Sequence, residues 1–283
     1  MKRLLFILAA FVANNSWAAD NQIYIEQTVT STDSQIDLRQ IGGGNIIAKS
    51  NDGSVAMKLN GSNLDFSLWQ IGDSNKFLSD INVSSSDFDI DWTGDSNTFT
   101  GLFNSAGTYS MLNTDFDNLI LGGNNTLTVS IAEGADATDS TFNWYINGSD
   151  NTVTLEAATF AQHNTKGDFN AADSSNMNLD WDINGSNNTA TVIIQSKYVT
   201  QDWDITGNYN NVDYIGINNS SATSGNGHSS TLNLTGDYWD VNIQQRSSSN
   251  NDMINFTGSG SGTSGTPATL CIIQNDSGTN TGC

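Results

Sequence analysis

A Gly-x-x-Asn unit recurs along this chain, and it limits the possible folds more than any other feature of the sequence. Seven copies pair a glycine with an asparagine three positions later: Gly42/Asn45, Gly72/Asn75, Gly94/Asn97, Gly122/Asn125, Gly148/Asn151, Gly185/Asn188 and Gly207/Asn210. An eighth copy begins at Gly236 and lacks the asparagine, and neighbouring glycines lie 22 to 37 residues apart. Self-similarity at such a spacing indicates a protein built from stacked structural repeats.

Alternating apolar and polar residues flank each copy. One example is the run Leu179-Asp180-Trp181-Asp182-Ile183 ahead of Gly185, and the alternation resumes at Ala190, after Asn188. Strict alternation places the two sets of side chains on opposite faces of a β-strand. Glycine and asparagine suit a tight turn, since both tolerate positive φ. Each copy therefore predicts a strand, a turn and a second strand.

The predicted fold is an all-β solenoid of stacked strand–turn–strand repeats, with eight or nine coils. A single unit cannot bury its apolar face alone, and stacking the copies buries it. At about 4.8 Å per coil, the stack is on the order of 40 Å long. A β-sandwich or barrel of short strands is the alternative. The return of the same residue types at the same offsets from each glycine favours the solenoid, and no helical periodicity is present.

The sequence divides into four expected regions. They are a signal peptide at 1–18, the solenoid at 19–256, a Gly/Ser-rich linker at 257–267 and a terminal strand or cap with a cysteine pair at 268–283. The first region has the basic Lys2 and Arg3, a short apolar run and the cleavage motif Ser16-Trp17-Ala18. We expect a bacterial protein exported through the periplasm to the cell surface or beyond. No later apolar run is long enough to predict a membrane span.

The C-terminal region leaves two questions open. Cys271 and Cys283 are the two cysteines of the chain, and we expect them to pair in an oxidising compartment. The bond is either a covalent end cap or a local staple on a frayed tail. The segment Ala268–Gln274 reads as a final strand, which either folds back as the cap or docks on a neighbouring subunit.

Two of the repeats carry a family resemblance. Residues 40–45 and 70–75 both read Gln-x-Gly-x-x-Asn, which resembles the repeat core of curlin, the subunit of bacterial curli fibres. The resemblance implies a secreted β-solenoid that self-associates into cross-β fibres, a nucleator or co-subunit, and a dedicated outer-membrane channel. It also implies that Gln40, Asn45, Gln70, Asn75 and the later turn asparagines stack as amide ladders. The later copies replace the glutamine, the spacing is irregular and the cysteine-bearing tail is unlike a curlin.

The charge of the chain excludes one class of function and leaves two interpretations of the acidic surface. With 9 Lys plus Arg against 30 Asp plus Glu, net −21, it has no basic face for nucleic acid. Many aspartates alternate with apolar residues: Asp87, Asp89, Asp91, Asp180, Asp182, Asp202 and Asp204. They either provide solubility by charge repulsion or bind Ca²⁺ or a cationic partner. No calcium-binding loop motif is present, so no metal site is predicted.

The sequence contains no recognisable catalytic motif. His163 and His228 lie in polar contexts that predict surface loops, and no Ser/His/Asp or Cys/His set emerges. We therefore expect neither an enzyme nor a cofactor. The expected function is a secreted, curli-like structural subunit, of the major or the nucleator type, that assembles into extracellular cross-β fibres for adhesion and biofilm matrix. The alternative is a monomeric secreted β-solenoid adhesin or carbohydrate-binding module.

Overall fold

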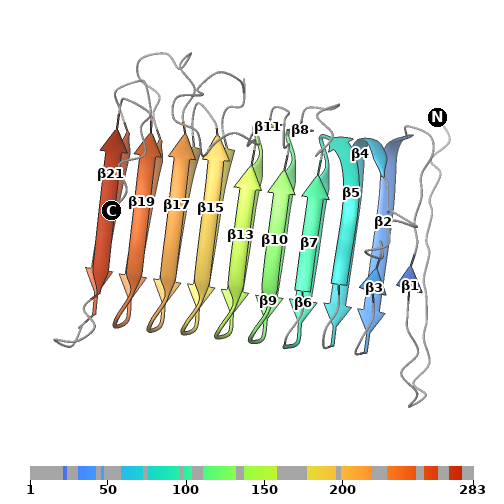
Figure 1. Ribbon diagram of the computed structural model, residues 1–283. Helices are drawn as coiled ribbons and strands as arrows, with labels where there is room; N and C mark the ends of the chain where they lie inside the picture. The colour runs from blue at the N-terminus through green and yellow to red at the C-terminus, as the bar shows by residue number, and fades with distance from the viewer. Residues whose placement is uncertain are drawn as a thin grey trace.

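The fold is a stack of parallel strands. The computed structural model describes residues 22–23, 31–42, 46–47, 59–72, 76–95, 98–103, 111–131, 137–157, 177–195, 199–217, 228–246, 252–260 and 268–275. These segments contain strands and turns and no helix. The strands form two facing sheets, and every pairing within them is parallel (Figure 1).

The first sheet holds the strand that precedes each turn. Its members are β2 (Ser31–Ile41), β4 (Asn60–Ile71), β6 (Asp87–Thr93), β9 (Asp115–Leu121), β12 (Thr141–Asn147), β14 (Met177–Asn184), β16 (Val199–Thr206), β18 (Ser229–Thr235) and β20 (Met253–Ser259). Each strand pairs with the next in this order, so the sheet grows steadily along the chain.

The second sheet holds the strand that follows each turn. Its members are β1 (Gln22–Ile23), β3 (Ile46–Ile47), β5 (Lys76–Ser84), β7 (Thr98–Phe103), β10 (Thr126–Ile131), β13 (Thr152–Ala157), β15 (Thr189–Gln195), β17 (Asn211–Ile217), β19 (Asp240–Arg246) and β21 (Thr269–Asn275). The end of β5 also pairs with the start of β4, which joins the two sheets at one corner. A separate short pair is made by β8 (Met111–Leu112) and β11 (Ala137–Thr138).

Nine strand–turn–strand coils are therefore present in the described part of the chain, from β2/β3 to β20/β21. The predicted β-solenoid of eight or nine coils is confirmed. Figure 1 shows the coils side by side, in chain order, with the Gly-containing turns along one edge. Because the register is exact from coil to coil, equivalent residues form columns, such as Trp144, Trp181 and Trp203.

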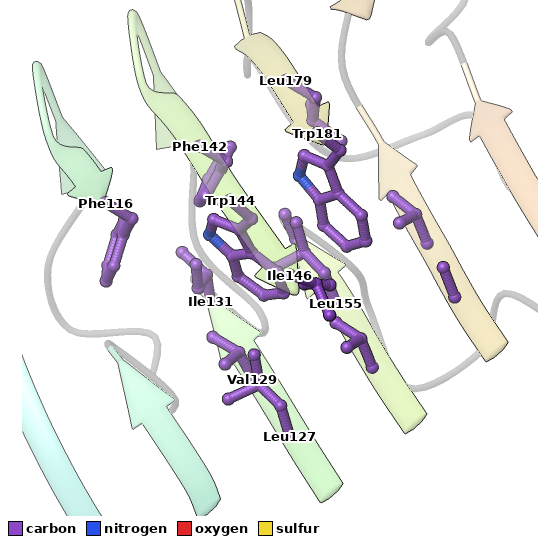
Figure 2. Packing of buried hydrophobic residues seen from close by; sticks show 14 of the residues in the cluster. Phe116, Leu127, Val129, Ile131, Phe142, Trp144, Ile146, Leu155, Leu179 and Trp181 are labelled. Carbon is purple, nitrogen blue, oxygen red and sulfur yellow. The ribbon is translucent and has the colours of Figure 1, made fainter. Parts of the chain in front are cut away.

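The core is the space between the two sheets. Burial alternates strictly along β14 and β16, so Leu179, Trp181 and Ile183 point inward while the intervening residues face solvent. Aromatic rings stack along the columns, with 4.5 Å between the centroids of Trp144 and Trp181 and 5.5 Å between those of Phe116 and Phe142 (Figure 2). Offset stacks of this kind add about 0.5–1.5 kcal/mol each beyond their buried area. The expected interior columns of Phe, Leu, Ile and Trp are thus observed.

The C-terminal region begins later than the sequence boundaries suggest. Strand β20 extends to Ser259, so residues 257–259 of the expected linker belong to the ninth coil. The remainder of that linker, 261–267, and the expected signal peptide, 1–18, lie outside the described residues. The segment expected to form a final strand is β21, which pairs with β19.

Candidate functional site

The repeat turn has one backbone conformation throughout the described copies. Its glycine has positive φ, for example 145° at Gly185 and 129° at Gly207. The third residue of the turn is left-handed as well, as at Asn187 and Tyr209, with φ near 58°. The motif asparagines Asn125, Asn151, Asn188 and Asn210 do not have positive φ. The interpretation that they are selected for positive φ is therefore wrong, and their role lies in their side chains.

The turns of neighbouring coils stack so closely that only glycine fits at their first position. The backbone N–H of Gly185 donates to the carbonyl of Thr206 in the following coil at 2.9 Å, so the coils are hydrogen-bonded through the turn. A Cβ atom at Gly185 would overlap the carbonyl oxygen of Gly148, one coil earlier. Close stacking of backbones and positive φ together exclude other residues.

The turn glycines of the earlier copies have the same conformation. Gly42, Gly72, Gly94, Gly122 and Gly148 all have positive φ. Asn45, Asn75 and Asn97, their partners in the first three copies, lie outside the described residues. A further repeat glycine, Gly260, was missed in the sequence: a Cβ there would overlap the carbonyl oxygen of Gly236, so it begins the ninth turn. Its Gly/Ser-rich context hid it, because no asparagine follows at the expected offset.

The motif asparagines form a ladder along the turn edge. The Oδ1 of Asn188 accepts the backbone N–H of Asn151 at 3.0 Å, and its Nδ2 donates to the carbonyl of Gly148 at 3.0 Å. Asn151 and Asn210 make the equivalent bonds. These side chains are buried. Each amide therefore satisfies backbone groups of the preceding coils, and the turns are held together independently of the strands.

The two predicted ladder glutamines are brought together. The Nε2 of Gln70 donates to the Oε1 of Gln40 at 2.9 Å, and both side chains are buried in the first sheet. The column continues with Trp92 in place of an amide, so this ladder has two members. Gln40 Nε2 and Gln70 Oε1 have no hydrogen-bond partner in the described part of the chain.

A second buried amide network was not foreseen from the sequence. It lies in the C-terminal coils, where Gln245 Nε2 donates to Ser230 Oγ at 2.7 Å and so links the two sheets through the interior. Gln201 Nε2 donates to the same hydroxyl, and Trp203 Nε1 donates to Gln201 Oε1 at 2.7 Å. Gln274 Nε2 donates to Gln245 Oε1 at 3.0 Å. In the sequence, these glutamines occupy positions of the apolar/polar alternation that point into the core, and this pattern could have predicted their burial.

His228 is buried, and the prediction that it lies in a surface loop is wrong. It precedes β18 directly, in the column that contains Val199 and Met177 in the two coils before. Its backbone N–H donates to Asp252 Oδ1 at 2.9 Å, and neither ring nitrogen has a hydrogen-bond partner among the described residues. Burial lowers the pKa of His228 to about 4. His163 lies outside the described residues.

The acidic residues form in-register columns on the outer face of the first sheet. Asp180 and Asp182 lie opposite Asp202 and Asp204 of the next coil. Burial, followed by these neighbouring carboxylates, raises the pKa of Asp180, Asp182 and Asp202. Burial, followed by carboxylates of the adjacent coils such as Asp65 and Asp117, also raises the pKa of Asp87 and Asp89. The columns therefore hold like charges close together, at a cost to the stability of the folded coils.

Asparagines interrupt these columns and bind the adjacent carboxylate. Asn143 Nδ2 donates to Asp117 Oδ1 at 2.8 Å, and Asn233 Nδ2 donates to Asp204 Oδ1 at 2.7 Å. A shallow groove of about 250 Å³ crosses this face beside the exposed Tyr145, between acidic side chains. No group of three or more His, Cys, Asp or Glu residues arranged to hold a metal ion occurs in the part of the chain that the structure describes.

The last coil leaves its inward-facing residues accessible. Leu270 and Ile272 on β21 continue the columns of Val241 and Ile243, which are fully buried one coil earlier. Cys271 lies between them on the opposite side of the strand, in register with Asn242, and it is disulfide-bonded. Cys283, the expected partner, lies outside the described residues. Leu270 and Ile272 are exposed, so the inward side of β21 is uncovered.

Comparison with protein-family models, with curated protein sequences and with solved structures finds no match. Within the described ranges, no helix is long and apolar enough to cross a membrane. The candidate functional features are therefore those of the stacked coils. Amide ladders and backbone hydrogen bonds join one coil to the next, and the inward-facing apolar residues of the last described coil are exposed to solvent.

Proposed function

We propose that this protein is a secreted structural subunit, of the major or the nucleator type, that assembles into extracellular cross-β fibres for adhesion and biofilm matrix. The observation that carries the proposal is the accessible last coil, β20/β21. Its apolar columns and strand edges have the same form as those that join one coil to the next inside the chain. An uncovered parallel edge of this kind is a template for pairing with another chain.

The internal stack supports the proposal in a second way. Parallel backbone hydrogen bonds join all nine coils of the described part of the chain, and the central coils add aromatic stacking and the asparagine ladder. Cross-β fibres are stabilised by the same interactions between chains. The resemblance of residues 40–45 and 70–75 to curlin repeats adds a nucleator or co-subunit and an outer-membrane channel as expected partners.

Seeded polymerisation tests this function. Residues 19–283 are purified in denaturant, diluted, and followed by thioflavin fluorescence with and without preformed fibre fragments, and the product is imaged by electron microscopy. We expect thin fibres, a lag phase that seeds remove, and a diffraction spacing of about 4.8 Å along the fibre. A β-rich monomer that persists in the presence of seeds would contradict the proposal.

An aromatic pair on the turn edge favours the second candidate function, a monomeric adhesin or carbohydrate-binding module. Tyr209 and Tyr238 stack at 4.7 Å, and both have the left-handed conformation, which is uncommon for a bulky residue. The equivalent position in the preceding turn is Asn187. The exposed ring of Tyr209 and the partly exposed ring of Tyr238, beside short polar side chains, form a surface on which a sugar ring can stack. Glycan binding by a stable monomer, lost in Tyr209→Asn, would support this function.

A further inference from the structure

The groove on the outer face of the first sheet has an apolar centre between acidic ends. One outward-facing column runs along it, with one residue from each of four successive coils: Asp91, Leu119, Tyr145 and Asp182. Leu119 is partly exposed, and the ring of Tyr145 is exposed. The groove has a volume of about 250 Å³. It therefore offers an apolar and aromatic surface at its centre and a carboxylate at each end.

A second carboxylate stands beside the first at each end of the groove. Asp89 is the outward neighbour of Asp91 on β6, and Asp180 is the outward neighbour of Asp182 on β14. Strands β6 and β14 are three pairings apart in the sheet. At the usual spacing of paired strands, the two carboxylate pairs are about 14 Å apart. The groove thus has two separate anionic ends rather than one continuous acidic surface.

Like charges surround the four carboxylates in the described part of the chain. Burial, followed by neighbouring carboxylates, raises the pKa of Asp89 and Asp91 at one end, and it raises the pKa of Asp180 and Asp182 at the other. All the charged groups that shift these pKa values are aspartates. A cationic ligand would relieve this repulsion, so charge complementarity favours a ligand with positive charge at both ends.

The same column already holds a cation on an aromatic ring in the first two coils. Arg39 and Trp69 are in register there, and the guanidinium carbon of Arg39 lies 4.1 Å from the centroid of the Trp69 ring. Tyr145 is the next aromatic residue of the column, but its neighbours in register are Leu119 and Asp182. A cation supplied by a ligand can lie on Tyr145 as Arg39 lies on Trp69, because the face of an aromatic ring attracts positive charge.

We propose that this groove binds a linear aliphatic polyamine, with a terminal ammonium group at each carboxylate pair and its methylene chain across Leu119 and Tyr145. Ammonium groups donate charge-assisted hydrogen bonds to carboxylates, and methylene chains cover apolar surface. The volume lies below the range of roughly 300–1,000 Å³ for pockets that hold drug-sized ligands, which suits a thin chain. This inference goes beyond the proposed fibre function and does not depend on it, because every contact lies within one copy.

Equilibrium dialysis of spermine against residues 19–283 at physiological salt tests the inference. The method measures binding to monomers and fibres alike, so its result does not depend on polymerisation. We expect saturable binding of a single spermine per chain. Two diamines of equal charge separate length from charge: α,ω-diaminodecane is long enough to reach both carboxylate pairs, and putrescine is too short. We expect the long diamine to bind more tightly than putrescine.

Two double variants test the site itself. Asp91→Asn with Asp182→Asn removes one carboxylate from each end of the groove, and we expect the Kd of spermine to rise about tenfold. Asp37→Asn with Asp204→Asn is the matched control, because it removes the same charge from outward positions of the same sheet, beyond the two ends of the groove. At physiological salt, which screens more distant charges, it should change the Kd by less than about twofold. Tyr145→Ser should weaken binding with no change in charge.

Four results would overturn the inference. The first is an equal loss of affinity in the two double variants, since the whole face would then attract cations without a site. The second is equal affinity for the two diamines, and the third is displacement of spermine by Ca²⁺ at equal concentration. The fourth is tighter binding of tetralysine than of spermine, which would indicate a basic peptide as the partner. Circular dichroism establishes that the variants fold, and the diamine comparison uses only the wild-type protein.

Discussion

The side chain of Asn188 accepts a hydrogen bond from the backbone N–H of Asn151, the equivalent residue one coil earlier, at 3.0 Å. Because Nδ2 of Asn188 also donates to the carbonyl of Gly148, one amide satisfies a buried and a partly buried backbone group. The asparagine of the Gly-x-x-Asn unit therefore links neighbouring turns by hydrogen bonds. Where the unit repeats, these bonds run from turn to turn along the stack, as backbone hydrogen bonds run from strand to strand in the sheets.

Asn188→Ala removes both of these bonds. It leaves the N–H of Asn151 and the carbonyl of Gly148 without their side-chain partner, and an unsatisfied buried group costs about 1–3 kcal/mol. We expect the free energy of unfolding in urea to fall by roughly 1–3 kcal/mol, since the N–H of Asn151 is buried and the carbonyl of Gly148 is partly buried. The control Asn184→Ala, an exposed position on β14, should change it by less than about 0.5 kcal/mol. Equal effects of the two substitutions would argue against the ladder.

Gly207→Ala tests the close stacking of turns. The added Cβ would meet the carbonyl of Gly185, at a residue whose φ is 129°. Strained backbone of this kind costs about 1–3 kcal/mol before the overlap is counted. We expect a large fall in the urea midpoint, while Thr206→Ala, one residue earlier and exposed, has a small effect. An unchanged midpoint in Gly207→Ala would show that the turns can separate without loss.

For the Gln40–Gln70 pair, we predict that a second substitution restores stability that the first one removes. Gln40→Met alone leaves the buried Nε2 of Gln70 without its acceptor, and we expect a cost of about 1–3 kcal/mol. Adding Gln70→Met removes the second amide, together with an Oε1 atom that has no partner among the described residues. The double variant should be more stable than Gln40→Met alone, since replacing both partners by apolar groups can be nearly neutral. A double-mutant cycle in urea measures the coupling, and additive effects would contradict it.

His228 makes the fold sensitive to acid. Its pKa in the folded protein is lowered to about 4, from an ordinary value of 6.5, because the ring is buried. The unfolded chain therefore binds a proton first, and stability is lost as the pH falls from about 6.5 to about 4, by up to about 3 kcal/mol. His228→Met, which introduces the residue type of Met177 in the same column, should remove this loss. Urea denaturation of both proteins at pH 7.5 and pH 4.5 is the measurement, and parallel changes would contradict the prediction.

The carboxylate columns predict the opposite pH dependence. The pKa of Asp202 is raised in the folded protein, so its unfavourable contribution is present at neutral pH and disappears as the pH falls below the unfolded value near 3.8. Asp202→Asn should therefore stabilise the protein at pH 7 by roughly 0.2–1 kcal/mol, as expected for relief of a cross-strand charge pair. The gain should shrink in high salt and vanish at pH 3. If the gain in stability depended on neither salt concentration nor pH, its cause would not be the relief of charge repulsion.

Much of the fold was predictable because its signals are local. Alternation along 179–183 identified the inward side chains before any contact was known, and the structure buries Leu179, Trp181 and Ile183 as expected. The turn position was equally readable from Gly185. The role of Asn188 was not, because its partners, Asn151 and Gly148, lie 37 and 40 residues away.

The wrong prediction for His228 and the unpredicted glutamine network have the same cause. His228 has polar neighbours in sequence, but it is buried because Val199 and Met177 continue its column in other coils. Gln201 and Gln245 looked unremarkable singly, and Ser230 joins them only when the two sheets face each other. Single residues in a repeat protein take their environment from the coils above and below.

The sequence by itself determined which face of each strand every side chain occupies, since a period of two residues and a turn glycine are local properties of the backbone. The tertiary structure alone decided which residues of different coils become neighbours and which columns are left uncovered. Ile243 and Ile272 illustrate the difference: both are inward isoleucines of the same column, yet the first is buried and the second is exposed. The cause is that a described coil follows Ile243 and none of the described residues forms a coil after Ile272, and no local pattern records this difference.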